Sequence, residues 1–96
     1  MNDITFTWNA AKNSANKRKH GIDFEEAQTV FFDENAQFID DPDHSFEEER
    51  FILLGLSTSL RMLVVCHCYR ESDEVIRIIS ARWATPGETR GYRHGT

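Results

Sequence analysis

Hydrophobic and polar positions follow two periods along the chain, and these separate the expected strands from the expected helices. Residues 4–8 alternate large apolar side chains with threonines at a period of two, which predicts a short first strand. Asn9 then suits a helix N-cap, and Gly21 suits the left-handed position that ends a helix. The intervening residues are rich in helix formers, so a helix is predicted over residues 10–20.

The predicted helix over residues 10–20 has an unusual polar side. At about 100° per residue, one narrow stripe collects three polar residues with a histidine beside it: Lys12, Asn16, Lys19 and His20. Ala11 and Ala15 lie together elsewhere. We therefore expect this helix to pack through a thin apolar strip and to present a basic face.

A second helix is predicted to begin after Asp23, which suits an N-cap. Glu26 follows three residues later, as in a capping box. Apolar residues then repeat at i, i+3 and i+7, at Phe24, Ala27 and Phe31. Residues 20–23 leave room only for a tight corner, so the second helix anchors the first.

The strand pattern recurs in the second half of the chain, over residues 36–40, 50–56, 61–70 and 75–82. Short polar segments connect these strands, with a Pro- and Asp-rich loop at residues 40–43, a hairpin at 57–59 and a turn at 71–74. Strands joined by such short connections are expected to form an antiparallel meander.

A last helix is predicted from Thr85 as N-cap, Pro86 at the first helical position and Glu88 as the capping-box residue, running to about Tyr92. The predicted order is β-α-α-β-β-β-β-α. We expect an α+β fold with a single antiparallel sheet and helices packed mainly on one face. The 96 residues, 40% of them apolar, suffice for one modest core, so residues 1–96 are expected to form a single domain.

Several classes of protein are excluded by composition. No apolar run approaches the roughly 18 residues of a membrane span, and the N-terminus lacks the order of a signal peptide, so a cytoplasmic protein is expected. Cys66 and Cys68 stand one residue apart in an apolar run and are expected to be reduced core thiols. A zinc site would need two more ligands at suitable spacing, and His67 between the cysteines points to the opposite strand face, so we expect no metal site. We also expect no cofactor.

The net charge of −5 conceals a strong asymmetry along the chain. Residues 23–50 hold eleven acidic residues and one basic residue, whereas the remainder holds ten basic and five acidic residues. The acidic segment is expected to bind a basic partner or to promote solubility, because phosphates would be repelled there. A basic surface assembled from the remainder is the alternative to ordinary solvated charge.

Arginines within apolar strands need a partner or open surface. Alternation places Arg82 on the same face of the last strand as Ile76, Ile78 and Ser80, and Arg77 on the other. We expect both arginines to project into a shared groove. The alternative is that each forms a salt bridge with a surface carboxylate.

These features together resemble the BrnT family. The resemblance spans nearly the whole chain and is carried by WNAAK at residues 8–12, KHG at 19–21, FEEA at 24–27, Phe32-Asp33, Gly55, IRIISAR at 76–82, and Ala84, Thr85, Glu88 and Tyr92. The chain departs from the family pattern at Asn9, where Asp is common, and at Trp83, Pro86 and Gly87, where basic residues are frequent.

The resemblance implies the toxin of a bacterial type II toxin–antitoxin system with a RelE-like ribonuclease fold. Such a toxin would be a metal-independent endoribonuclease that cleaves RNA through 2′-hydroxyl attack and inhibits translation. The implied partner is a BrnA-like ribbon-helix-helix antitoxin in a hetero-oligomer that contacts DNA only through the antitoxin, with no membrane contact. The alternative is a non-catalytic antitoxin-binding module that acts mainly as corepressor of its own operon.

Metal-free RNA cleavage requires a proton acceptor, a proton donor and cations around the phosphate. The candidate catalytic residues are Lys19, His20, Arg77 and Arg82, and the candidate RNA-binding residues are Lys12, Arg61, Arg70 and Tyr92. His20 suits proton transfer, with an ordinary helix-terminal histidine as the alternative. Arginines suit phosphate because guanidinium binds it in a bidentate manner.

Several other polar and aromatic residues have structural interpretations. Tyr92 could stack on a base or pack on the sheet, and Glu88 is expected to cap a helix rather than act in catalysis. His67 and Trp8 are expected to lie in the core.

Overall fold

The computed structural model describes residues 4–39, 50–70 and 74–94. Its elements are, in chain order, β1 (Thr5–Thr7), α1 (Ala10–His20), α2 (Phe24–Thr29), the 3-10 helix η1 (Val30–Phe32), β2 (Gln37–Ile39), β3 (Phe51–Leu56), β4 (Met62–Arg70), β5 (Val75–Trp83) and α3 (Pro86–His94). The predicted order of helices and strands is confirmed, with η1 added. The predicted loop at 40–43 and most of the turn at 71–74 lie outside the described residues.

The five strands form one sheet in the order β1-β5-β4-β3-β2. Strands β2 to β5 pair in an antiparallel manner, as predicted, but β1 runs parallel to β5. The expectation of a wholly antiparallel sheet is therefore wrong. No hairpin joins β1 to β5, so turn geometry does not set their relative direction, whereas short connections reverse the chain between β3 and β4 and between β4 and β5.

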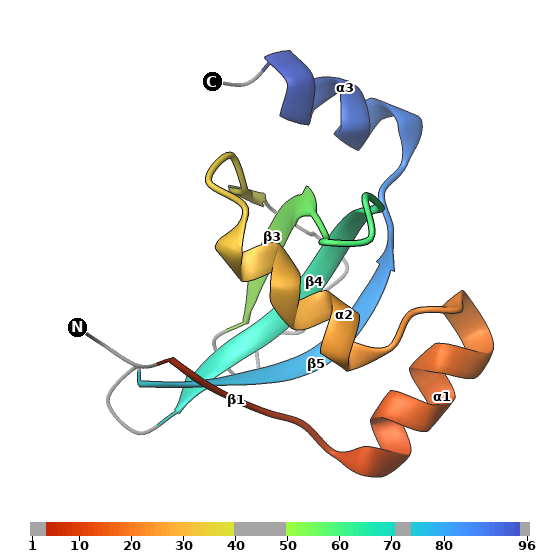
Figure 1. Ribbon diagram of the computed structural model, residues 1–96, viewed down its shortest axis with the longest axis vertical. Helices are drawn as coiled ribbons and strands as arrows, with labels where there is room; N and C mark the ends of the chain where they lie inside the picture. The colour runs from red at the N-terminus through yellow and green to blue at the C-terminus, as the bar shows by residue number, and fades with distance from the viewer. Residues whose placement is uncertain (1–3, 40–49, 71–73, 95–96) are drawn as a thin grey trace.

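The sheet carries an apolar cluster on each face. Helix α2 crosses in front of the sheet, and α1 lies beside β5 (Figure 1). The face under α2, called the α2 face below, forms the main core with Ile22, Phe24, Ala27, Val30, Leu53, Leu63, Val65, Ile78 and Ala81. The second face carries Ile52, Leu54, Val64 and Cys66, with Tyr92 of α3 packed against them. The helices are thus not all on one face, because α3 contributes to the second cluster.

A β-bulge changes which side chains of β5 share a face. Cys66 pairs with Ser80 and His67 pairs with Ile78, so Ile79 is an additional residue in β5. Alternation reverses at this point. The predicted placement of Ser80 and Arg82 on the face of Ile76 and Ile78 is therefore wrong.

Beyond the bulge, Ala81 joins Ile78 in the core under α2, and Arg82 lies opposite Val64 on the second face. Arg77, which pairs with Cys68, is on that face as well. The bulge therefore brings both arginines to one face of the sheet, although simple alternation separates them.

Helix α1 docks on β5 through amide hydrogen bonds. Asn16 is only 8% exposed, and its Nδ2 donates to the carbonyl oxygens of Ala81 at 2.9 Å and Ile22 at 3.0 Å. Its Oδ1 accepts from Ala81 N at 3.1 Å. Ala11 and Ala15, the predicted packing strip, are exposed. The prediction was wrong because these alanines offer little apolar area, whereas Asn16 pairs with backbone groups at the edge of β5.

The predicted boundaries of α1 are confirmed. Asn9 Oδ1 accepts from Lys12 N at 3.0 Å, and Gly21 adopts the left-handed conformation with φ of 72°. Asp23 also caps α2 as predicted, by accepting from Glu25 N. Glu26 does not complete a capping box, because its carboxylate binds Arg61 and Ser57 instead.

Candidate functional site

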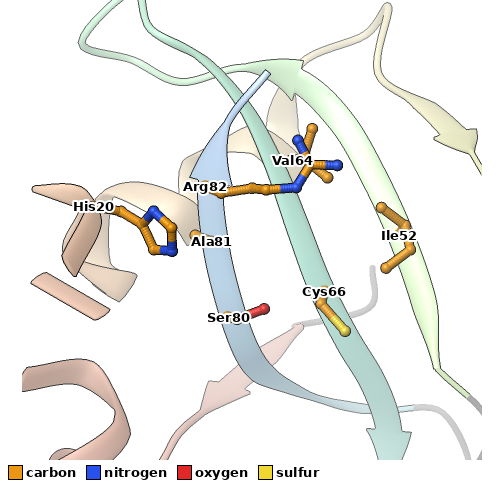
Figure 2. A pocket seen from close by; sticks show the side chains of 7 residues that line it. All are labelled: His20, Ile52, Val64, Cys66, Ser80, Ala81 and Arg82. Carbon is orange, nitrogen blue, oxygen red and sulfur yellow. The ribbon is translucent and has the colours of Figure 1, made fainter. Parts of the chain in front are cut away.

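A cavity of about 100 Å³ lies where α1 meets the C-terminal half of β5. It is lined by His20, Ile52, Val64, Cys66, Ser80, Ala81 and Arg82. Figure 2 shows His20 reaching toward β5 from the end of α1, and Arg82 extending from β5 across β4 beside Val64. Two predicted catalytic residues, 62 positions apart in the sequence, therefore line the same cavity.

Arg82 forms a bidentate ion pair with Glu88 of α3. Its two terminal nitrogens lie 2.9 Å from the two carboxylate oxygens, and Nη1 also donates to the carbonyl oxygen of Trp83 at 3.1 Å. The hydrogen bonds from Arg82, opposed by burial and assisted by Thr85, lower the pKa of Glu88 to about 2. For Arg82 the structure thus matches the salt-bridge alternative, with the carboxylate supplied by the neighbouring helix.

The predicted capping role of Glu88 is confirmed. Thr85 N donates to Glu88 Oε1 at 2.9 Å, and Glu88 N donates to Thr85 Oγ1 at 3.1 Å. One carboxylate therefore closes the N-terminus of α3 and holds Arg82. The orientation of the guanidinium in the cavity depends on the position of α3.

His20 is half-buried at the C-terminus of α1. Its backbone carbonyl accepts a hydrogen bond of 3.2 Å from Nε1 of Trp83. The last turn of the helix also carries Lys17, Arg18 and Lys19, all exposed, so the approach to His20 from this helix is basic. Lys19 does not line the cavity.

Three other predicted site residues, Lys12, Arg70 and Arg77, do not line the cavity. Arg77 is half-buried and shares the second face with Arg82, but does not line the cavity. Arg70 pairs with Val75, at the opposite end of β5 from Arg82. Lys12 is exposed in the first turn of α1. The structure thus brings together His20 and Arg82, and leaves these three residues outside the cavity lining.

Arg61 lies beside α2 and joins four segments of the chain. Its Nε donates to Glu26 Oε2 at 2.8 Å, Nη2 bonds the other Glu26 oxygen, and Nη2 also donates to Gly21 O at 3.1 Å. These hydrogen bonds lower the pKa of Glu26, against burial, and raise the pKa of Arg61. The guanidinium carbon also lies 4.9 Å from the ring centroid of Trp83. This residue is engaged in the internal packing of the corner between α1 and α2.

Tyr92 follows the packing alternative. Its hydroxyl donates to Asp33 Oδ2 at 2.7 Å, and its ring packs on the second-face cluster. Burial raises the pKa of Asp33, but the N–H groups of Leu56 and Asn35 and the Tyr92 hydroxyl outweigh it, so the pKa is lowered overall. Burial and the bond to Asp33 raise the pKa of Tyr92. These contacts fix α3 over the end of β3.

His67, Trp8 and the two cysteines lie in the interior, as predicted. His67 is fully buried, and burial lowers its pKa, opposed by the carbonyl of Val65 at 3.3 Å from Nδ1. Trp8 packs partly buried against the core. Cys66 and Cys68 are buried thiols of β4.

Some cavity residues were missed in the sequence analysis. Ser80 and Cys66 line the cavity because the bulge sets their pairing, and the sequence carries no clear signal for a bulge there. Asn16 was included in a polar stripe, but its burial was not foreseen. An asparagine on the side of a helix that lacks apolar residues is the signal that could have indicated docking through hydrogen bonds.

Residues 4–39, 50–70 and 74–94 contain neither a cluster of metal ligands nor a membrane-spanning helix. Within these ranges no group of three or more His, Cys, Asp or Glu side chains is placed to hold a metal ion. None of the described helices combines the length and apolarity needed to cross a membrane.

Comparison with known proteins gives concordant results for sequence and fold. Residues 8–88 match the model of a family described as the ribonuclease toxin, BrnT, of type II toxin–antitoxin systems. The structure is similar to the crystal structure of the Brucella abortus ribonuclease toxin BrnT, with a TM-score of 0.65 and 21% sequence identity. That match covers 86% of this chain and 99% of the Brucella chain. A search of curated proteins finds no match.

Proposed function

The chain belongs to the BrnT family of ribonuclease toxins of type II toxin–antitoxin systems, and from this premise we propose that the cavity between His20 and Arg82 is its endoribonuclease site. The observation that carries the proposal is the lining of one cavity by both side chains, which come from α1 and β5. They combine a group suited to proton transfer with a group suited to phosphate.

The proposed reaction is attack of a ribose 2′-hydroxyl on the adjacent phosphorus. The 2′-oxygen loses its proton to a base and forms the new P–O bond. The 5′-oxygen of the next nucleotide leaves and takes up a proton, which gives a 2′,3′-cyclic phosphate and a 5′-hydroxyl. His20 transfers protons in this scheme, since an imidazole can both accept and donate a proton. Arg82 stabilises the charge that develops on the phosphate oxygens.

Binding of a phosphate at Arg82 involves exchange with Glu88. A guanidinium presents the same paired N–H donors to a carboxylate and to a phosphate, so the two compete for one geometry. The two 2.9 Å hydrogen bonds to Glu88 hold the Arg82 guanidinium in a fixed orientation. The Glu88 carboxylate also competes with phosphate for the same donors. Lys19 and Arg77, near the cavity on α1 and the second face, would add positive charge.

The same proposal includes several finer statements. The reaction proceeds without a metal, and the RNA path extends over Lys12, Arg61, Arg70 and Tyr92. RNA cleavage inhibits translation, and a ribbon-helix-helix antitoxin neutralises the toxin. The family assignment supports an RNA substrate and an antitoxin partner in general terms.

A second candidate function is a non-catalytic antitoxin-binding module that acts as corepressor. The observation that favours it is the engagement of Arg82 by Glu88, which occupies the donors that a phosphate would need. The two functions differ in a direct way, because only the first requires cleavage by the purified protein.

The test is single-turnover RNA cleavage in EDTA, with a thermal melt for every variant. His20→Ala and Arg82→Ala are each expected to lower the cleavage rate by roughly ten- to ten-thousandfold. Arg18→Ala is the matched control, because Arg18 is an exposed cation in the same turn as His20. Full cleavage by folded His20 and Arg82 variants would place the active site elsewhere. Activity that is lost in EDTA and restored by a divalent ion would contradict the metal-independent mechanism.

A further inference from the structure

Trp83, the last residue of β5, is an exposed aromatic side chain held in a fixed orientation. It is 48% exposed, yet its Nε1–H donates to the carbonyl oxygen of His20 at 3.2 Å. The guanidinium carbon of Arg61 lies 4.9 Å from its ring centroid. Arg61 is itself fixed by Glu26 and Gly21. An indole with this much exposed surface and two restraining contacts is preorganised to receive a flat ligand.

The location of this indole connects it with the proposed active site. Trp83 follows Arg82 in β5, and its ring nitrogen is bonded to the backbone of His20. Both neighbours line the cavity. The two side chains leave β5 on opposite faces, because Trp83 pairs with Leu63 on the α2 face and Arg82 pairs with Val64 on the second face. The ring therefore lies at the end of β5 next to His20, on the other side of the strand from the Arg82 guanidinium. A chain of nucleotides with a phosphate between His20 and Arg82 would reach the ring by passing around the end of β5 beside His20.

We propose that Trp83 is a stacking site for an unpaired nucleobase of the RNA whose phosphate is held in the cavity between His20 and Arg82. The inference rests on the proposed function. Unstacked bases of single-stranded RNA bind aromatic side chains through their faces, and this contact tolerates any base because each has a π-face. Arg61 stands over one face of the ring, so the base stacks on the other face. The site thus contributes affinity for single-stranded RNA and positions the strand.

Phe38, another exposed aromatic residue of the described chain, does not share these properties. Phe38 is 63% exposed, but it lies on β2, at the opposite edge of the sheet from β1 and two strands away from β4. Its ring contacts Phe51 and His67. Phe38 therefore provides a matched control, as an exposed aromatic side chain remote from β5.

The first experiment measures binding without cleavage. The probe is a single-stranded oligoribonucleotide in which every 2′-hydroxyl is methylated, so that the attacking group is blocked. Trp83→Leu is expected to raise the Kd by about 5- to 150-fold, Trp83→Phe by less, and Phe38→Leu not at all. In a Trp8→Phe protein, Trp83 is the remaining indole, and the oligonucleotide is expected to quench its fluorescence.

The second experiment separates base stacking from support of His20. An otherwise identical probe lacks the bases but retains the sugar–phosphate backbone. If Trp83 stacks on a base, Trp83→Leu weakens binding of the complete probe and changes the Kd of the abasic probe by less than about twofold. An equal loss for both probes, or an unchanged Kd for the complete probe, overturns the stacking site.

Cleavage by the wild-type protein tests the proposed function separately. If the wild-type protein cleaves RNA but Trp83→Leu shows no base-dependent loss of binding, the proposed function stands and the stacking site is overturned. If the wild-type protein does not cleave RNA but binding at Trp83 depends on the bases, the stacking site stands and the proposed endoribonuclease function is contradicted.

Discussion

His67 is a fully buried histidine surrounded by aromatic rings. The ring centroids of Phe31, Phe38, Phe51 and Tyr69 lie 4.7 to 6.1 Å from that of His67. Among the described residues no partner is found for its Nε2, so a proton there would leave a charged donor in an apolar setting. Burial accordingly lowers the pKa of His67.

This burial makes folding stability sensitive to mild acid. Because the pKa of His67 is lower in the folded than in the unfolded state, the unfolded chain binds the proton more readily. Stability is therefore expected to fall as the pH drops below about 6.5, by at most about 1.4 kcal/mol per pH unit. His67→Leu, of similar volume, is expected to flatten this slope between about pH 5 and 6.5. Urea unfolding across that range measures it, and equal slopes for both proteins would contradict the account.

At the scale of elements, α1 depends on one asparagine for its position. Within the described chain, strand β1 pairs only with residues 75–77 of β5, so the edge of β5 near Ala81 has no neighbouring strand there. The side-chain amide of Asn16 fills this position and bonds both the N–H and the C=O of Ala81. It also donates to Ile22, which ties the end of the helix to the same point. His20, one turn later, is placed in the cavity by this contact.

Asn16→Asp tests this arrangement with almost no change of shape. One carboxylate oxygen still accepts from Ala81 N, but the other faces the carbonyl oxygens of Ile22 and Ala81. We expect a loss of about 2–5 kcal/mol at pH 7. The loss should diminish at acidic pH, because a protonated carboxyl regains a donor.

Asn13→Asp is the control for Asn16→Asp. The Oδ1 of Asn13 accepts from Phe24 N at 2.9 Å, a bond that a carboxylate retains. Chemical unfolding at two pH values compares the variants. If both asparagine positions tolerate aspartate equally, the donor role of Asn16 is wrong.

Helix α3 is coupled to the cavity through Glu88. Glu88→Gln retains the shape of the side chain but removes the charge that competes with phosphate for Arg82. We expect binding of the methylated oligonucleotide to become several-fold tighter, while stability decreases by about 1–2 kcal/mol, a value reduced for solvent screening at this partly exposed pair. Fluorescence anisotropy and a thermal melt measure the two effects. Weaker binding by the folded variant would mean that Glu88 supports the phosphate site rather than competing with it.

The ion pair of α3 also predicts behaviour in strong acid. The pKa of Glu88 is lowered from 4.5 to about 2 in the folded protein, so its contribution is complete above about pH 4.5 and lost as the pH falls toward 2. Glu88→Gln is expected to lose less stability than the wild type across this interval, which lies well below the His67 range. Unfolding curves at pH 4.5 and 2.5 compare the two proteins, and parallel losses would contradict the assignment.

At the scale of the whole molecule, RNA binding has to occur on a protein of net charge −5. Residues 40–49, which hold much of the acidic segment, lie outside the described residues. Of the cations outside residues 23–50, Lys17, Arg61 and Arg82 already contact carboxylates. The protein is therefore expected to neutralise few phosphates.

The salt dependence of RNA binding measures this number. For single strands the slope of log K against log salt is about −0.7 per phosphate contact. We expect a slope no steeper than about −4, the value for the six proposed cations, reduced in magnitude by about 0.7 in Arg82→Ala and unchanged in Trp83→Leu, whose contact is uncharged. A steeper slope, or one that Arg82→Ala leaves unchanged, would contradict this distribution of contacts.

What the sequence determined by itself is mostly local. The caps at Asn9, Asp23 and Thr85 were predictable because a cap depends on neighbouring residues. The strands of the meander were predictable because alternation and short turns specify them. The family was also evident from motifs spread over the chain, and residues 8–88 match its model.

The tertiary structure decided which side chains meet. The parallel pairing of β1 joins segments distant in sequence, and the bulge opposite His67 depends on a single inserted residue. The ion pair of Glu88 with Arg82, six residues apart, depends on how α3 folds back after β5. A bulge reverses every later side chain, so alternation placed Arg82 on the wrong face. Proximity of His20 and Arg82 was expected from their charge. Their shared cavity forms where Asn16 and Trp83 hold α1 against β5 through hydrogen bonds that no local pattern encodes.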